Sequence, residues 1–388
     1  MAQAMAPAYR SPWRQQEHDD LADLARAFFV KEVLPDADRF TAQGHPDHDL
    51  YGRAGKHGLL GLSVPAEYGG GGGTFAHEAV VFEEQVRAGD ASLGLGVHSG
   101  IIMGYLVAYG TQEQKQRWLP GLCSGELVGA IGMTEPAGGS DLQAITTRAV
   151  RDGDDYLVSG SKTFITNGFL ADLLILAVKT DPTQKAAGMS LLVCELGDDV
   201  PGFSRGRVLH KIGLQANDTA ELFFDQMRVP AANLLGPGEG QGFIQMMQQL
   251  PQERLVISVS AVAAMERALE LTIAYTKERT AFGKPVFDQQ NTRFVLAECA
   301  AHSRAARTFV DDCIARHLAG ELDVATAAMA KFWLTDRQCE VVDKCLQLFG
   351  GYGYTTEYPI ARLYADARVQ KIYAGTNEIM KELVARSL

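Results

Sequence analysis

Residues 131–141 read Ile-Gly-Met-Thr-Glu-Pro-Ala-Gly-Gly-Ser-Asp, and residues 162–168 read Lys-Thr-Phe-Ile-Thr-Asn-Gly. Both stretches belong to a region, about residues 127–229, in which turn signals such as Asp152-Gly153-Asp154 separate short β-rich runs. Several short strands at this spacing are typical of a small β-domain, either a barrel or a sandwich. The runs that predict strands are 156–158, 173–178, 190–194 and 221–224.

Helical periodicity flanks this β-rich region on both sides. From Glu17 onward, apolar residues recur at three- and four-residue spacing, as in Leu21, Leu24, Ala25 and Phe28. Beyond residue 241, the stretches 255–277, 290–318 and 324–349 are amphipathic and contain few helix breakers. Long helices with short connections form a bundle, so the predicted order is helices, β-domain, helical bundle.

Composition excludes several classes of protein. With 388 residues, the chain is long enough for two or three domains. Its formal charge of −11 argues against binding to nucleic acid or to an anionic membrane, because both require a basic surface. Residues 91–112 carry no charge, but their five glycines and His98-Ser99 favour a buried helix or pocket lining over a membrane span. The first 13 residues show no targeting signal, which predicts a cytoplasmic protein.

Motifs for familiar catalytic sites are missing. No G-x-G-x-x-G opens a helix, the glycine run 69–73 lacks a following Lys-Ser/Thr, and neither G-x-S-x-G nor H-E-x-x-H occurs. The six cysteines form no C-x-x-C pair and predict reduced thiols, and no metal site is predicted. If the chain is an enzyme, a bound cofactor is expected to supply the difficult chemistry.

A third stretch, near the C-terminus, identifies a family. Residues 347–354 read Gln-Leu-Phe-Gly-Gly-Tyr-Gly-Tyr, residues 366–368 read Asp-Ala-Arg, and residues 372–379 read Ile-Tyr-Ala-Gly-Thr-Asn-Glu-Ile. Together with the two stretches in the β-region, they closely resemble the acyl-CoA dehydrogenase family over about residues 17–388. Singly, each stretch is also explained by a helix cap, a surface ion pair or a helix terminator.

The resemblance implies an α+β, mainly α, fold with three domains. These are an N-terminal helical domain over 1–126, a middle β-barrel domain over 127–235 and a C-terminal four-helix bundle over 236–388. It also implies FAD as cofactor, acyl-CoA as substrate, an electron-transfer flavoprotein as electron acceptor, and a homotetramer in which subunits share flavin sites.

Carried over by residue, the resemblance assigns contacts to FAD and to substrate. Hydroxyls of Thr134 and Thr166 would bond the flavin ring, and Phe164 would shield one of its faces. The implied FAD contacts within the β-region are Ile131, Met133, Thr134, Gly139, Ser140, Phe164, Ile165 and Thr166. Those reaching a neighbouring subunit or lying near the C-terminus are Arg279, Phe282, Gln290, Gln347, Leu348, Gly350, Gly351, Thr376, Asn377 and Glu378. The implied substrate contacts are Ser140, Ile244, Pro251, Arg254, Ala374 and Gly375.

The catalytic base is the position at which the sequence departs from most of the family. Removing a weakly acidic α-proton of a thioester requires a positioned carboxylate. Most members carry it as Tyr-Glu-Gly-Thr, whereas here residues 373–376 read Tyr-Ala-Gly-Thr. The long-chain and isovaleryl enzymes place a glutamate on a bundle helix instead, and Glu253 in Pro251-Gln-Glu-Arg254 resembles that variant. The alternative reading of Glu253 is a first-turn glutamate that interacts with the helix dipole.

The predicted reaction is the FAD-dependent α,β-dehydrogenation of medium- to long-chain acyl-CoA to trans-2-enoyl-CoA, with Glu253 as base and hydride transfer to flavin N5. Gly94, Gly96, Gly100 and Gly104 either leave room for a long acyl tail or allow tight helix packing. Three alternatives remain: a branched-chain or isoprenoid acyl-CoA dehydrogenase, an acyl-CoA oxidase, and a flavoprotein that binds acyl-CoA without turnover.

Overall fold

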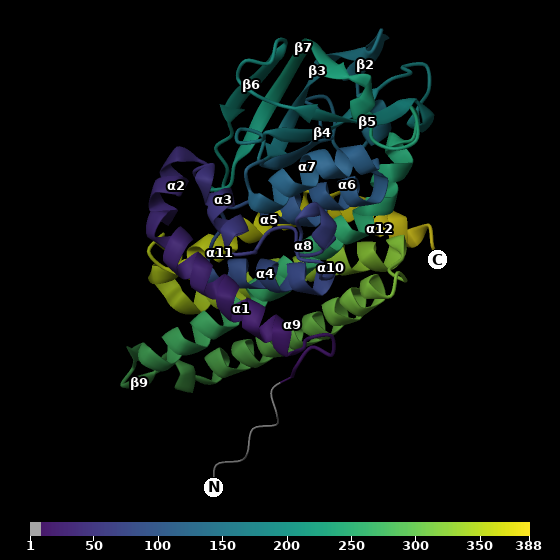
Figure 1. Cartoon of the computed structure of the whole chain (residues 1–388). Helices are drawn as coiled ribbons and strands as arrows, with labels where there is room; N and C mark the ends of the chain where they lie inside the picture. The colour runs from purple at the N-terminus through teal and green to yellow at the C-terminus, as the bar shows by residue number, and fades with distance from the viewer. Residues whose placement is uncertain (1–8) are drawn as a thin grey trace.

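The computed structural model describes residues 9–388 and has three parts (Figure 1). A β-sheet lies at one end, short N-terminal helices lie beside it, and long C-terminal helices form the other end. The N-terminal helices are α1 (Gln16–Phe28), α2 (Ala37–Gln43), α3 (Asp49–Lys56), α4 (Phe75–Ala88), α5 (Leu95–Val97), α6 (Met103–Tyr109) and α7 (Gln112–Ser124), with a π-helical segment, His98–Ile102, between α5 and α6. The predicted fold class is confirmed.

The sheet contains seven strands of mixed direction. They are β1 (Gly129–Gly132), β2 (Arg148–Asp152), β3 (Asp155–Thr166), β4 (Leu173–Lys179), β5 (Met189–Glu195), β6 (Phe203–Val208) and β7 (Thr219–Pro230). Strand β4 is buried along its whole length, as expected for an apolar run between neighbours, and pairs in parallel with β1 and antiparallel with β5. The ladder continues through β2, β3 and β7 to β6.

All four predicted strands are present. Strands β4 and β5 extend one or two residues beyond the predicted runs, whereas β3 and β7 are much longer than predicted. The runs 156–158 and 221–224 lie within β3 and β7, which are 12 residues long each. Register shifts interrupt their pairing between Val158 and Gly160 and between Lys162 and Ile165. A register shift changes which face a side chain occupies, so the alternation that marks a strand in sequence is lost there.

The C-terminal part consists of α8 (Gly242–Glu278), the hairpin β8 (Thr280–Ala281) and β9 (Lys284–Pro285), α9 (Gln290–Leu318), α10 (Val324–Phe349), α11 (Pro359–Ala367) and α12 (Asn377–Ala385). Helices α9 and α10 have the predicted bounds. Helix α8 begins before residue 255 because it continues through Pro251 rather than ending there. Among residues 9–388, the structure contains no helix that is both long and apolar enough to cross a membrane.

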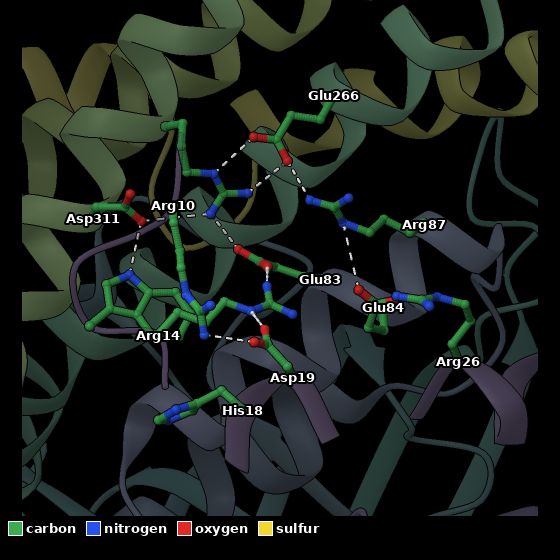
Figure 2. Close-up of polar contacts among 12 residues, drawn as sticks. Arg10, Arg14, His18, Asp19, Arg26, Glu83, Glu84, Arg87, Glu266 and Asp311 are labelled. Atoms are coloured by element: carbon green, nitrogen blue, oxygen red, sulfur yellow. Dashed lines mark hydrogen bonds and ion pairs between the residues drawn. The ribbon is translucent and has the colours of Figure 1, made fainter. Parts of the chain in front are cut away.

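A network of ion pairs joins the N-terminal segment to the bundle (Figure 2). Arg307 of α9 binds Glu83 of α4 and, at 2.8–2.9 Å, both carboxylate oxygens of Glu266 on α8. Trp13 donates from Nε1 to Asp311 of α9 at 2.9 Å. Glu83 and Asp311 are only 1 % and 3 % exposed, so their charges are compensated by neighbouring donors rather than by water. Residues 1–8, on which part of the targeting-signal prediction rests, lie outside the described residues.

Candidate active site

A buried ion pair holds the first motif stretch, residues 131–141, against the sheet. Lys162 of β3 donates from Nζ to Glu135 Oε1 at 2.9 Å and to the carbonyl of Met133 at 3.1 Å. Glu135 also accepts hydrogen bonds from the backbone N–H groups of Thr146 and Thr147 at 2.7 and 2.9 Å. Burial alone would raise the pKa of Glu135, but the charge of Lys162 and these donors together lower it to about 2. Residues 136–140, which follow this anchor, are exposed.

We expect Lys162→Met to lower the free energy of unfolding by roughly 3–5 kcal/mol, because Glu135 would keep its charge without a counter-ion. Thermal and urea unfolding would measure the loss. Arg228→Met is the matched control in the same sheet: Arg228 is 59 % exposed in its pairs with Asp152 and Asp155, so its loss should cost about 0–1 kcal/mol. Equal losses in the two variants would contradict the anchoring role.

The second motif stretch presents Phe164 on the surface beside a tightly bonded asparagine. Phe164 has φ 58° and is 67 % exposed, an unusual backbone and environment for a large apolar residue in a strand. Asn167 is fully buried: its Oδ1 accepts from the Tyr51 hydroxyl at 2.9 Å, and its Nδ2 donates to the carbonyl of Gly129 at 3.0 Å. Thr163 N–H bonds the carbonyl of Thr134 at 3.0 Å, so the two motif stretches lie together.

A second group of predicted cofactor residues lies at the far end of the bundle. The β8–β9 hairpin protrudes there, on the side of the molecule away from the sheet (Figure 1). Phe282 at its tip is 96 % exposed, and the Arg279 guanidinium lies 5.8 Å from the ring of Tyr352. Gln290, Gln347, Gly350 and Gly351 are exposed as well, whereas Leu348 is half-buried. The hairpin that carries Phe282 therefore lies apart from the sheet to which strands β1 and β3 of the two motif stretches belong.

The carboxylate of Glu253 is buried in the middle of α8. Glu253 is 6 % exposed, and its Oε1 accepts a hydrogen bond of 2.9 Å from the hydroxyl of Tyr105 on α6. Burial raises the pKa of Glu253 to about 7, and the hydrogen bond from Tyr105 and the charge of Arg254 offset only part of that rise. Because Glu253 lies well inside α8, the alternative reading as a first-turn glutamate does not apply. A carboxylate that titrates near neutral pH suits a general base.

Lys331 of α10 is bound to the loop at residues 373–376 and to the start of α12. Its Nζ donates to the carbonyl of Gly375 at 2.8 Å and to Asn377 Oδ1 at 3.1 Å. Burial, followed by the nearby charge of Arg254, lowers the pKa of Lys331 to about 7. Arg254 is itself 4 % exposed, and its Nε has no hydrogen-bond partner among the described residues. Arg254 therefore acts electrostatically both on Glu253 and on Lys331, and Lys331 is bound to the loop.

Ala374 lies in this loop with φ 50°, a left-handed conformation that is rare for a residue with a Cβ. Within residues 9–388 its backbone N–H makes no hydrogen bond. A free backbone donor in a strained loop is suited to bind an oxygen atom of a ligand. The Ala374 methyl group cannot accept a proton.

Other predicted residues differ in what they can offer a ligand. Ile165 and Asn377 are 2 % and 1 % exposed, and Asn377 is engaged by Lys331 and Thr335, so only their backbones are available. Thr376 caps α12 by accepting from the N–H of Ile379, and Ile244 is 53 % exposed. The remaining positions, partly or fully open to a ligand, are Ile131, Met133, Thr134, Gly139, Ser140, Thr166, Pro251, Gly375 and Glu378.

The glycines of residues 94–104 pack against neighbouring elements. A Cβ at Gly94 would approach Asn167 Oδ1 to 2.0 Å, and one at Gly96 or Gly100 would approach Val256 of α8 to 3.0 or 2.9 Å. Of the two readings of this stripe, the structure supports close helix packing rather than an open channel for a tail.

Comparison with known proteins agrees with this geometry. Models of the N-terminal, middle and C-terminal domains of acyl-CoA dehydrogenase match residues 15–126, 130–227 and 240–388. The chain belongs to the acyl-CoA dehydrogenase family. It is therefore an oxidoreductase that acts on the CH–CH group of acyl-CoA. The domain boundaries predicted at residues 126 and 235 stay a prediction.

Individual relatives of this acyl-CoA dehydrogenase differ in their named substrates. It is 47 % identical to the long-chain specific acyl-CoA dehydrogenase, mitochondrial, of Sus scrofa over 374 residues, covering 96 % of this chain and 86 % of that protein. It is 35 % identical to isovaleryl-CoA dehydrogenase, mitochondrial, of Oryza sativa, covering 95 % and 90 %. An acyl-CoA dehydrogenase structure from Geobacillus kaustophilus superposes with a TM-score of 0.94 at 47 % identity, covering 97 % and 99 %. A glutaryl-CoA dehydrogenase from Mycobacterium smegmatis in complex with FADH2 superposes at 0.89 and 28 % identity, covering 96 % and 95 %.

Three contacts of this acyl-CoA dehydrogenase's site were not predicted from sequence: Tyr105–Glu253, Lys331–Gly375 and Glu135–Lys162. Lys331 offered a signal, since it is the one cation in the apolar stretch 324–334. A charged residue on an otherwise apolar helix face is expected to find a buried partner. Tyr105 offered only its place in the uncharged stretch 91–112.

Proposed function

We propose that this chain catalyses the α,β-dehydrogenation of medium- to long-chain acyl-CoA, with Glu253 as the base and FAD as the cofactor. The observation that carries the proposal is the buried Glu253 carboxylate, whose pKa is near 7. It is supported by Ala374, which stands where most of the family has an acidic residue. In this proposal Glu253 removes the α-proton. The N–H of Ala374 and the adjoining backbone bind the thioester oxygen, which favours enolate-like charge.

The residues of the two β-region stretches fit a flavin. Phe164 offers an exposed ring, Thr134 and Thr166 offer hydroxyls, and the Glu135–Lys162 pair keeps residues 136–140 in a fixed, exposed position for a phosphate group. FAD, when bound, would accept the hydride from the β carbon. The chain's own contribution is then to place the substrate, remove its proton and keep water out.

We further propose a homo-oligomer, in keeping with the family's usual tetramer, in which one subunit completes the flavin site of another. The β8–β9 hairpin, which carries the exposed Phe282, lies on the side of the molecule away from the sheet (Figure 1), and Gln290, Gln347, Gly350 and Gly351 are exposed as well. The exposed ring of Phe282, at the tip of a protruding hairpin, is available to contact a neighbouring subunit. We propose an electron-transfer flavoprotein as acceptor, and the cytoplasmic location stays a prediction.

Anaerobic mixing of the FAD-loaded protein with acyl-CoA esters from C4 to C18, including branched members, tests the proposal. We expect bleaching of the flavin, fastest with medium- to long-chain esters. A flavin that stays yellow with every ester would favour the binding-protein alternative, and fastest bleaching with isovaleryl-CoA would favour the branched-chain alternative. Turnover with dioxygen that matches turnover with an artificial acceptor would favour an oxidase.

A further inference from the structure

The neighbours of Glu253 include a group to which no role has yet been given. Tyr105 lies 148 residues before Glu253 in the chain, is fully buried and donates its hydroxyl proton to Glu253 Oε1 at 2.9 Å. No other donor among residues 9–388 bonds the Glu253 carboxylate. We propose that the Tyr105 hydroxyl is a positioning group for the catalytic base: it holds one carboxylate oxygen of Glu253 and leaves the other free to take the substrate proton. This inference rests on the proposed function.

Close packing of the segment around α6 against α8 brings Tyr105 to Glu253. Gly96 and Gly100 allow the chain before α6 to approach Val256 closely, because a Cβ at either position would come within 3.0 Å of it. Residues 98–102 form a π-helical turn, a feature frequent at functional sites. The carbonyl of Gly100 in that turn accepts from Gln252 Nε2 at 2.7 Å, directly before Glu253 in sequence. The glycines and Gln252 thus fix the distance between the two helices that carry Tyr105 and Glu253.

A hydroxyl that donates to a carboxylate favours the ionised carboxylate. Burial and the neighbouring charge of Glu253 raise the pKa of Tyr105 far above its ordinary value, so its hydroxyl keeps its proton over the working pH range. The charged and titratable groups facing this pair are Arg254 on α8, which acts on Glu253, and Tyr109 on α6, which acts on Tyr105. Neither of them bonds the carboxylate, whereas Tyr105 does, so removal of the Tyr105 hydroxyl should change the pKa of Glu253 most.

Tyr105→Phe tests the inference, because it removes the hydroxyl and keeps the ring. Infrared difference titration of the FAD-loaded protein, with Glu253→Gln as reference, reports the protonated Glu253 carboxyl. We expect the midpoint to lie near 7 in the native protein and about one pH unit higher in Tyr105→Phe. Tyr109→Phe is the matched control: the Tyr109 hydroxyl bonds Gln248 at 2.8 Å instead of Glu253, so its midpoint should stay at the native value.

Bleaching kinetics with palmitoyl-CoA give a second readout. The bleaching rate should fall at low pH as Glu253 is protonated, and in Tyr105→Phe the midpoint of this fall should lie about one pH unit higher than in the native protein. Tyr105→Phe should therefore be about tenfold slower than the native protein at pH 6 and within about twofold of it at pH 9. A purely structural defect would slow the reaction at every pH and leave the midpoint of the pH dependence unchanged.

The outcomes separate the inference from the proposed function. An unchanged infrared midpoint in Tyr105→Phe, or a shift equal to that of Tyr109→Phe, overturns the role of Tyr105 whatever the enzyme does. A native protein that does not bleach with any acyl-CoA overturns the proposed function, while the infrared midpoint still decides whether Tyr105 controls the Glu253 carboxyl.

Discussion

Glu253→Gln is expected to lower the anaerobic rate of flavin bleaching by acyl-CoA by roughly 10²–10⁴-fold, the usual contribution of a general base. The amide has nearly the size of the carboxylate, and its oxygen can still accept the hydrogen bond from Tyr105. It cannot remove a proton from the α carbon. Stopped-flow absorbance of the flavin measures the rate, and the spectral change on mixing with substrate measures whether binding is retained.

Glu270→Gln is the matched control for this variant. Glu270 lies on the same helix, α8, but is 54 % exposed and forms only surface pairs with Arg87 and Arg267. Its replacement should leave the bleaching rate unchanged. If Glu253→Gln bleached as fast as Glu270→Gln, the base would have to be another group, and the proposed role of Glu253 would be wrong.

Replacement of Arg307 by leucine is expected to lower the free energy of unfolding by at least about 3–5 kcal/mol, because it removes one partner of a buried pair and leaves more than one carboxylate behind. Among the described residues, Glu83 would keep only Arg14 at 3.3 Å, and Glu266 would keep only its contact with Arg87 (Figure 2). The expected result is a marked drop in Tm, with faster hydrogen exchange in α4 and in the segment around Trp13.

The matching control lies on the same helix. Arg316 pairs with Asp312 at 2.7 Å but is 46 % exposed, so Arg316→Leu should cost about 0–1 kcal/mol. Glu83→Gln introduced together with Arg307→Leu should recover part of the loss by removing one uncompensated charge. Similar Tm values for the Arg307 and Arg316 variants would show that the network in Figure 2 does not stabilise the fold.

The bounds of α9 and α10 could be predicted from sequence because helix periodicity and capping are local properties of ten to thirty residues. The same reasoning put the start of α8 too late. Pro251 reads locally as a helix breaker, yet packing on both sides of it holds the helix together. Strands β1, β2 and β6 are short, at four to six residues each, so each offers too few residues for a clear alternating pattern. Strand β1 also pairs with β4, about 44 residues further along the chain.

For the candidate site, too, some features could be predicted from the sequence and others could not. Three motif stretches, and the exchange of an acidic residue for Ala374, were enough to indicate the family and to select Glu253. The hydrogen-bond donors to Glu253 and to Gly375 could not be predicted from the sequence. Tyr105 lies 148 residues from Glu253 in the chain, and Lys331 lies 44 residues from Gly375. The sequence also could not decide whether the glycines of residues 94–104 make room for an acyl tail or allow close packing. The contacts with Val256 and Asn167 in the structure support close packing.

The sequence by itself determined the order of the three parts of the chain and its likeness to the acyl-CoA dehydrogenases, and it singled out the carboxylate of Glu253 as the proposed base. Only the tertiary structure decided the environment of that carboxylate: its burial, its tyrosine donor and the charge of the buried Arg254. The reason is physical. Residue types and their spacing can be read directly from the sequence, whereas desolvation and hydrogen bonding depend on which distant segments pack against one another.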